Sequence, residues 1–204
     1  ILTDRYCVPP EDARHYDEKP LYVDPCYLPS DAARVIDAAP IARRNYGLRE
    51  DAVVYAALMA PYKILPALFD AWLTILEQVD GSVLWMREQS SGMAARLRDT
   101  AKARGVDPQR LTFSHPEPIP RYLARFRLAD VFLDSAPFGS HTTVNDALFA
   151  GLPVIALAGR SFAARASASQ VRAAGLDELV VDDIDGYVRT AVALGRDPAR
   201  LRGM

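Results

Sequence analysis

From residue 46 onward, short runs of consecutive apolar residues alternate with longer segments in which apolar residues recur every three or four positions. The run from Val53 to Ala57 is typical of a strand buried on both faces, and a helical stripe follows from Leu65 to Val79. Similar runs predict strands at 82–86, 111–114, 130–134, 153–157 and 179–181, and the periodic segments predict helices at 94–104, 119–126, 143–150, 162–174 and 184–194. Repeated strand–helix–strand units imply parallel strands with right-handed crossovers, so the pattern predicts a doubly wound α/β domain.

The first 45 residues follow a different pattern, because prolines interrupt every segment that could form a long helix. Proline lacks an amide donor and restricts the residue before it. Residues 1–3 and 21–23 are candidates for short extended segments, and residues 30–39 carry a weak helical pattern. We expect 1–45 to be a connector with the end of a preceding domain, and 46–204 to be the α/β domain. Because the chain opens without Met, we expect a piece of a longer polypeptide.

Composition and charge narrow the class of protein. The chain has 204 residues, 50% of them hydrophobic, and its 24 basic and 26 acidic residues give a net charge of −2. This balance excludes a disordered chain and argues against nucleic acid as a partner. No apolar run is long enough to cross a bilayer, and Cys7 and Cys26 lack the spacing of a metal site. With no signal peptide in view, we expect no membrane partner and a reducing, cytoplasmic setting.

Candidate chemistry lies in the segments that follow predicted strands, because ligands of open parallel sheets bind beyond the carboxyl ends of the strands. These segments are 58–63, 114–122, 134–143 and 158–165. The third leads from Gly139 through His141, Thr142 and Thr143 into a helix. One interpretation is a capping box in which Thr143 caps the helix and Asp146 returns a hydrogen bond. The other is an anion site, since free amides and the helix dipole attract phosphate, and both can hold together.

Lys63 follows the first predicted strand across a short turn, where a lysine can reach a phosphate. The alternative is a solvated lysine whose charge is slightly unfavourable at a helix start. His115 and Arg165 lie in the same crevice segments, but single residues of these types are weak signals. The sequence has no Walker loop, no GxGxxG, no GxSxG and no HExxH motif, which argues against P-loop, α/β-hydrolase and zincin chemistry.

Read together, these segments resemble the C-terminal half of the catalytic region of O-linked N-acetylglucosaminyltransferases, including bacterial relatives that carry tetratricopeptide repeats. The matching stretches are YGLREDAVVY at 46–55, YKI at 62–64, SVLW at 82–85, LADVFLD at 128–134, HTT at 141–143 with Asp146, and AGLPV at 150–154. The helix with Arg165, Ala168, Ser169 and Gln170 also matches, as do ILTD at 1–4, VPPE at 8–11 and YDEK at 16–19. The resemblance spans nearly the whole chain.

The resemblance implies a GT-B architecture, in which two Rossmann-like domains enclose the active site and the C-terminal one holds UDP. It implies an inverting transfer of N-acetylglucosamine from UDP-N-acetylglucosamine to Ser or Thr of proteins, with no metal and no other cofactor. Lys63 matches a lysine that contacts the diphosphate, and Tyr62 matches an active-site tyrosine. The remaining matches are to the nucleotide: Thr142 and Thr143 to phosphate donors with His141 beside them, Asp146 to the ribose-binding acid, and Arg125 to a position near the uracil.

Three positions depart from the family pattern. Ala60 replaces a glutamine near the diphosphate, Ile119 replaces a lysine associated with the nucleotide, and Tyr122 replaces a histidine beside the base. Two alternatives therefore stay open: a non-catalytic GT-B-like interaction domain, or a GT-B enzyme that uses another UDP-sugar. Because the catalytic base, the N-terminal catalytic domain and the tetratricopeptide repeats lie outside this chain, we expect the chain alone to be inactive.

Overall fold

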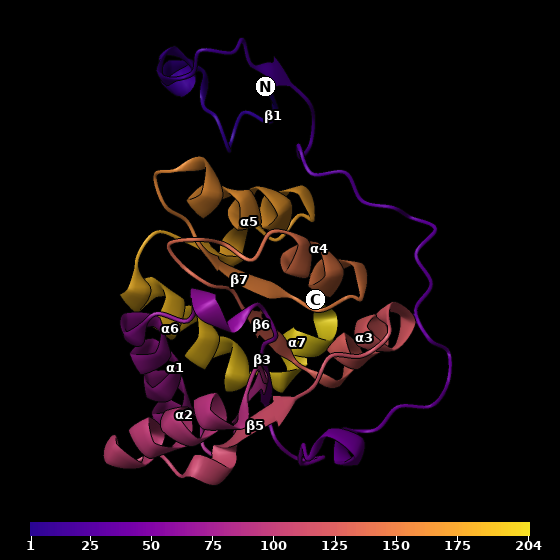
Figure 1. Cartoon of the computed structure of the whole chain (residues 1–204), viewed down its shortest axis with the longest axis vertical. Helices are drawn as coiled ribbons and strands as arrows, with labels where there is room; N and C mark the ends of the chain where they lie inside the picture. Colours follow the sequence, from indigo (N-terminus) through magenta and orange to yellow (C-terminus); the bar gives the residue numbers. More distant parts are fainter.

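A computed structural model describes residues 1–204 and contains one six-stranded parallel sheet in the order β5-β4-β3-β6-β7-β8 (Figure 1). The strands are β3 (Val54–Ala57), β4 (Val83–Arg87), β5 (Leu111–Ser114), β6 (Val131–Leu133), β7 (Val154–Leu157) and β8 (Val180–Val181). Renumbered from the first strand of the sheet, this is the 3-2-1-4-5-6 order of Rossmann-type domains. The doubly wound parallel sheet predicted from the sequence is therefore confirmed.

Helices cover both faces of this sheet. They are α1 (Pro66–Gln78), α2 (Ser91–Ala103), α3 (Ile119–Arg125), α4 (Thr142–Phe149), α5 (Phe162–Ala173), α6 (Ile184–Gly195) and α7 (Pro198–Gly203). The chain winds outward from β3 to β5 and then from β6 to β8, so right-handed crossovers put α1 and α2 on one face and α4 and α5 on the other. Helix α6 returns to pack beside α1 (Figure 1).

Two buried aromatic side chains connect α1 and α6 to the sheet through a chain of hydrogen bonds that reaches the predicted crevice. The Trp72 indole on α1 donates to the Tyr187 hydroxyl on α6 at 3.2 Å, and that hydroxyl donates to the Asp134 carbonyl oxygen at 2.8 Å. Both aromatic residues have 0% relative exposure. Because buried polar groups need partners, these bonds fix α1 and α6 against the segment that follows β6.

The first 28 residues form a small unit that packs beside α5 (Figure 1). Two short strands, β1 (Leu2–Thr3) and β2 (Leu21–Tyr22), lie within the two segments predicted to be extended, and they pair in parallel. The buried Asp4 carboxylate accepts from the Ser169 hydroxyl of α5 at 2.6 Å and from three backbone amides of its own unit. This carboxylate therefore joins the N-terminal unit to the α/β domain.

The helix predicted at 30–39 is wrong, because this segment runs extended along the side of the α/β domain (Figure 1). The Asp37 amide donates to the Pro120 carbonyl oxygen on α3 at 3.0 Å, and Arg34 contacts α4. Tertiary hydrogen bonds have replaced the local ones that a helix would make. No helix in the structure is both long enough and apolar enough to span a membrane.

Candidate functional site

The site lies where the strand order of the sheet reverses, between β3 and its neighbour β6. The Lys63 ammonium, after β3, donates to the Gly139 carbonyl oxygen, after β6, at 2.6 Å. The Gly139 amide in turn donates to the Ala163 carbonyl oxygen, after β7, at 3.1 Å. The crevice segments that follow these three strands are therefore in contact, as expected for the switch point of a doubly wound sheet.

Lys63 is held in a fixed position rather than extended into solvent. Its ammonium lies 4.4 Å from the centroid of the Phe138 ring, and that ring stacks on His141 with centroids 5.0 Å apart. Burial lowers the pKa of Lys63, and the nearby charge of Asp134 acts in the opposite direction. A partly desolvated cation in a preorganised position stabilises an incoming anion more than a mobile surface lysine does.

Helix α4 presents its amino end to the same crevice. The N-cap is His141 with a φ of 45°, and it makes no side-chain cap. The amides of His141 and Thr142 donate to no acceptor within the chain, and the His141 Nε2 lies 3.1 Å from the Ala163 carbonyl oxygen. Thr142 is exposed and Thr143 is half-buried. Free amides, hydroxyl donors and the helix dipole together form a site suited to phosphate.

The capping box predicted between Thr143 and Asp146 is wrong. Helix α4 begins at Thr142, one residue earlier than predicted, and the Asp146 carboxylate turns outward instead of returning to the helix start. Its Oδ1 pairs with Arg34 Nη1 at 2.5 Å, and its Oδ2 accepts from the Tyr122 hydroxyl at 3.0 Å. A charged partner outside the helix has displaced the local hydrogen bond.

Arg125 is buried, whereas Tyr62 is exposed to solvent. Arg125 is 1% exposed; its Nη1 donates to the His115 carbonyl oxygen at 3.0 Å, and its guanidinium lies 4.7 Å from the Tyr122 ring centroid. Burial lowers the pKa of Arg125, and neighbouring Tyr122 and Glu117 oppose that shift. Arg125 thus holds the backbone of the segment after β5 in position through its hydrogen bond to the His115 carbonyl oxygen. Tyr62, in contrast, is 76% exposed beside Lys63.

His115 and Arg165 are engaged elsewhere. The His115 ring is exposed, with its Nε2 3.5 Å from a Glu88 carboxylate oxygen. Arg165 pairs with Asp12 of the N-terminal unit at 2.9 Å. Both residues therefore make contacts at the margins of the crevice rather than within it.

Asp134, the residue that follows β6, organises the loop before α4, a role that the sequence analysis did not predict. Its carboxylate is 1% exposed and accepts from the Ser140 amide at 2.9 Å, while its carbonyl oxygen receives the Tyr187 hydroxyl. Burial raises the pKa of Asp134, and the hydrogen bond from Ser140 acts in the opposite direction. Asp134 therefore sets the backbone that carries Gly139 and His141.

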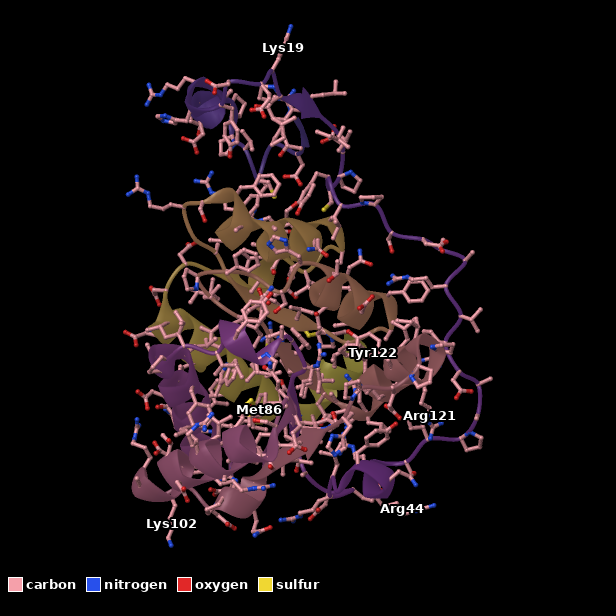
Figure 2. The ribbon with its side chains drawn as sticks, viewed as in Figure 1. Lys19, Arg44, Met86, Lys102, Arg121 and Tyr122 are labelled. Atoms are coloured by element: carbon pink, nitrogen blue, oxygen red, sulfur yellow. The ribbon has the colours of Figure 1, made fainter.

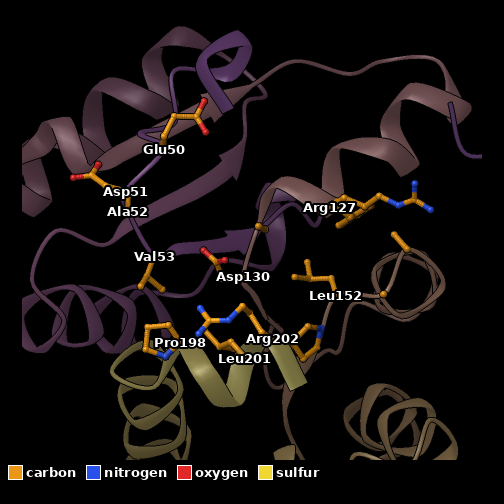
Figure 3. Close-up of a pocket in the computed structure, with 15 residues that line it drawn as sticks. Glu50, Asp51, Ala52, Val53, Arg127, Asp130, Leu152, Pro198, Leu201 and Arg202 are labelled. Carbon is orange, nitrogen blue, oxygen red and sulfur yellow. The ribbon is translucent and has the colours of Figure 1, made fainter. Parts of the chain in front are cut away.

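A separate cavity of 560 Å³ lies at the opposite, amino-terminal edge of the strands (Figure 3). Residues that precede strands line one side, and α7 supplies Pro198, Leu201 and Arg202 on the other. Its Asp130 carboxylate is already bonded to Arg43 at 2.9 Å and to the Val54 amide at 2.7 Å. The acid at the centre of this cavity is therefore already paired. No group of three or more His, Cys, Asp or Glu side chains in the structure could hold a metal ion.

The strand order and the position of the site are those of a Rossmann-type α/β domain. Residues 29–204 match the model of Glycosyl transferase family 41, and the chain belongs to this family. A solved structure of a mutant Thermobaculum terrenum O-GlcNAc transferase superposes with a TM-score of 0.87 at 30% identity, covering 99% of this chain and 38% of that one. This likeness confirms the fold expected for the C-terminal domain of a GT-B enzyme.

Two curated relatives are similar in sequence. The Arabidopsis thaliana protein "Probable UDP-N-acetylglucosamine--peptide N-acetylglucosaminyltransferase SEC" is 31% identical over 210 residues, covering 100% of this chain and 22% of its own length. The Caenorhabditis elegans protein "UDP-N-acetylglucosamine--peptide N-acetylglucosaminyltransferase" is 37% identical over 163 residues, covering 80% of this chain and 14% of its own length. The chain thus spans less than a quarter of either relative.

Proposed function

We propose that this chain is the nucleotide-sugar-binding half of an inverting, metal-independent glycosyltransferase that moves N-acetylglucosamine from UDP-N-acetylglucosamine to Ser or Thr of proteins. The observation that carries the proposal is the fixed Lys63 ammonium beside the free amides of α4, at the switch point of a family 41 domain. Relatives named as peptide N-acetylglucosaminyltransferases support the choice of sugar and acceptor.

The diphosphate binds between Lys63 and the amino end of α4. Negative charge grows on the departing UDP as the glycosidic bond breaks, and donors that are already in place stabilise that charge without reorganising. Lys63 supplies the cation, and Thr142 and Thr143 supply hydroxyl and amide donors with His141 beside them. Tyr62 is exposed next to Lys63 and faces the transferred sugar.

The nucleoside lies toward α3. The Asp146 carboxylate accepts the ribose hydroxyls. Its hydrogen bond from the Tyr122 hydroxyl of α3 supports a position for Asp146 between the phosphates and the base. Arg125 supports the segment after β5 that borders the uracil, through its bond to the His115 carbonyl oxygen. Since the guanidinium is buried, its contribution to the base is to hold this backbone in position.

The remaining parts of the reaction belong to other regions of the intact protein. Residues 1–45 lead from an N-terminal catalytic domain, residues 46–204 form the UDP-binding domain, and tetratricopeptide repeats select the acceptor protein. The catalytic base comes from the N-terminal domain, so the isolated chain does not turn over. The protein works in a reducing, cytoplasmic setting.

A related enzyme that uses a different UDP-sugar is the second candidate. Ile119, at the start of α3, is 63% exposed, so this edge of the site presents an apolar side chain rather than a cation. The amide-presenting end of α4 and Lys63 serve any nucleoside diphosphate. The choice of sugar therefore depends on residues outside the diphosphate site.

Incubating the intact protein with a Ser/Thr-containing acceptor and a panel of UDP-sugars tests the proposal. We expect mass addition on the acceptor from UDP-N-acetylglucosamine at least ten times faster than from UDP-glucose or UDP-galactose. Preference for another sugar would select the second candidate. Tight UDP binding with no transfer from any sugar would indicate a non-catalytic relative.

A further inference from the structure

The connector between the N-terminal unit and the α/β domain runs along the side of that domain, past α4 and α3 (Figure 1). The Asp37 amide bonds to the Pro120 carbonyl oxygen at 3.0 Å, and the Asp37 carboxylate lies 3.6 Å from Arg121. Figure 2 labels Arg121 and Tyr122 on α3, the helix along which the connector runs. These contacts fix the connector against α3 on one side of Asp146.

Arg34, within this connector, reaches Asp146 with a guanidinium that is held on several sides. Its Nη1 lies 2.5 Å from Asp146 Oδ1, and its Nη2 donates to the Asn145 side-chain oxygen at 2.8 Å. Its Nε donates to the Asp31 carbonyl oxygen at 3.1 Å, and its plane covers the Phe149 ring at 4.1 Å from the centroid. The guanidinium is therefore fixed by its own segment and by three residues of α4.

Such a pair differs from an ordinary surface ion pair. Exposed pairs contribute little because two long side chains lose rotamer freedom and water screens the charges. The Arg34 and Asp146 side chains are only 19% and 21% exposed, and the planar fork contacts two neighbouring acceptors on α4 at once. This geometry holds one rotamer of the carboxylate.

The carboxylate keeps capacity for a ligand. An ionised carboxylate has about four lone-pair sites on its two oxygens. Arg34 occupies one of them on Oδ1, and the Tyr122 hydroxyl occupies one on Oδ2. One lone-pair site remains on each carboxylate oxygen. These two sites match the two hydroxyls of a ribose ring.

We propose that Arg34 is a positioning residue of the nucleotide site, which orients Asp146 to accept both ribose hydroxyls. This inference rests on the proposed function, since it requires that UDP binds at Lys63 and α4. The proposal extends the donor site to the connector, which precedes the first strand of the sheet. A residue of the connector then orients a ribose-binding carboxylate that lies 112 residues later in the chain.

The test measures affinities of the intact protein for UDP and for 2′,3′-dideoxy-UDP, which lacks both hydroxyls, by calorimetric titration. We expect wild type to prefer UDP. Arg34→Met keeps the length of the apolar stem and removes the charge, so UDP affinity falls about tenfold while dideoxy-UDP affinity is unchanged. Arg34→Lys keeps the charge and can pair with Asp146 but lacks the planar fork that bonds Asp146 and Asn145 from two separate nitrogens, so we expect it to restore part of the preference.

The matched control is Arg104→Met, which breaks a 2.6 Å ion pair with Asp70 far from the site and leaves both affinities unchanged. An unchanged preference in Arg34→Met, whether both affinities stay or both fall equally, would overturn the inference. Equal binding of both ligands by wild type would also overturn it while leaving the diphosphate site intact. Wild type that binds no UDP would contradict the proposed function itself.

Discussion

The Lys63 ammonium donates to the Gly139 carbonyl oxygen at 2.6 Å, and this bond joins the segments that follow two neighbouring strands. Lys63 ends a short 3-10 helix, Pro61–Lys63, and its amide donates to the Ala60 carbonyl oxygen at 3.1 Å. Gly139 lies on a loop that is anchored by the Ala163 carbonyl oxygen and, at the next residue, by the Asp134 carboxylate. The cation is therefore placed before any ligand arrives. Preorganisation of this kind lowers the free energy that binding spends on ordering side chains.

The first prediction concerns the pH dependence of UDP binding. Burial holds the pKa of Lys63 below its ordinary value of 10.5, and a bound diphosphate favours the ammonium form. UDP affinity should therefore be constant while Lys63 is protonated, and should fall as pH rises through the pKa of the free site. Calorimetric titrations between about pH 7.5 and 10.5 measure this fall.

Lys63→Arg provides the comparison for that experiment. A guanidinium stays charged throughout this range, so the variant should lose the fall in affinity even if its overall affinity is lower. A fall of the same size in Lys63→Arg and wild type would show that another group causes the pH dependence.

A second prediction concerns Asp134 and the stability of the fold. Burial raises its pKa, so between the ordinary value of 3.8 and the raised value the folded state binds more protons than the unfolded state. The free energy of unfolding contributed by this group therefore falls as pH rises through that window. Asp134→Asn keeps the acceptor for the Ser140 amide and cannot ionise.

Urea unfolding across the acidic range measures the difference. The stability of Asp134→Asn relative to wild type should increase as pH rises, whereas Asp99→Asn, on the exposed face of α2, should track wild type at every pH. A constant difference between Asp134→Asn and wild type would mean that the carboxyl does not change its protonation in this range.

A third prediction tests the packing of α6 on β3. A Cβ at Gly195 would lie 2.0 Å from the Tyr55 hydroxyl oxygen and 3.1 Å from a Val79 methyl carbon. The Tyr55 hydroxyl is buried and bonded to the Ala191 carbonyl oxygen at 2.8 Å, so the ring cannot move aside freely. Gly195→Ala should lower the free energy of unfolding by about 1–3 kcal/mol, as overpacking does.

Two further variants separate crowding from helix propensity. Tyr55→Phe removes the atom that the new methyl would meet, so the double variant should recover part of the loss relative to the sum of the single effects. Gly203→Ala in α7 meets no atom within 4 Å and should change stability little. Additive effects of Gly195→Ala and Tyr55→Phe would contradict the steric explanation.

The sequence predicts the elements of the α/β domain well, because continuous apolar runs and helical stripes are local signals of burial. Its boundaries differ by a few residues: α2 begins at Ser91 rather than Ala94, since the Ser90 hydroxyl caps it through the Met93 amide. The extended course of residues 30–39 could not be predicted from local pattern, because its hydrogen bonds go to α3 and α4.

The site shows the same division. Lys63 and the start of α4 follow predicted strands, so the rule for parallel sheets predicts that they meet. The partner of Asp146 could not be predicted, since Arg34 lies 112 residues earlier and no periodicity links the two positions. The contact of Phe138 with Lys63 has a usable signal in the sequence, namely an aromatic residue next to a glycine in a crevice loop.

The central claim is that Lys63 and the amino end of α4 bind the diphosphate of a UDP-sugar, and calorimetric titration of UDP tests it most directly. Loss of a hydrogen bond to a charged group removes about 1.5–3 kcal/mol, so Lys63→Ala should weaken UDP binding at least tenfold. Lys102→Ala, which removes an exposed lysine of α2, should bind like wild type. Equal UDP affinity in wild type and Lys63→Ala would contradict the claim.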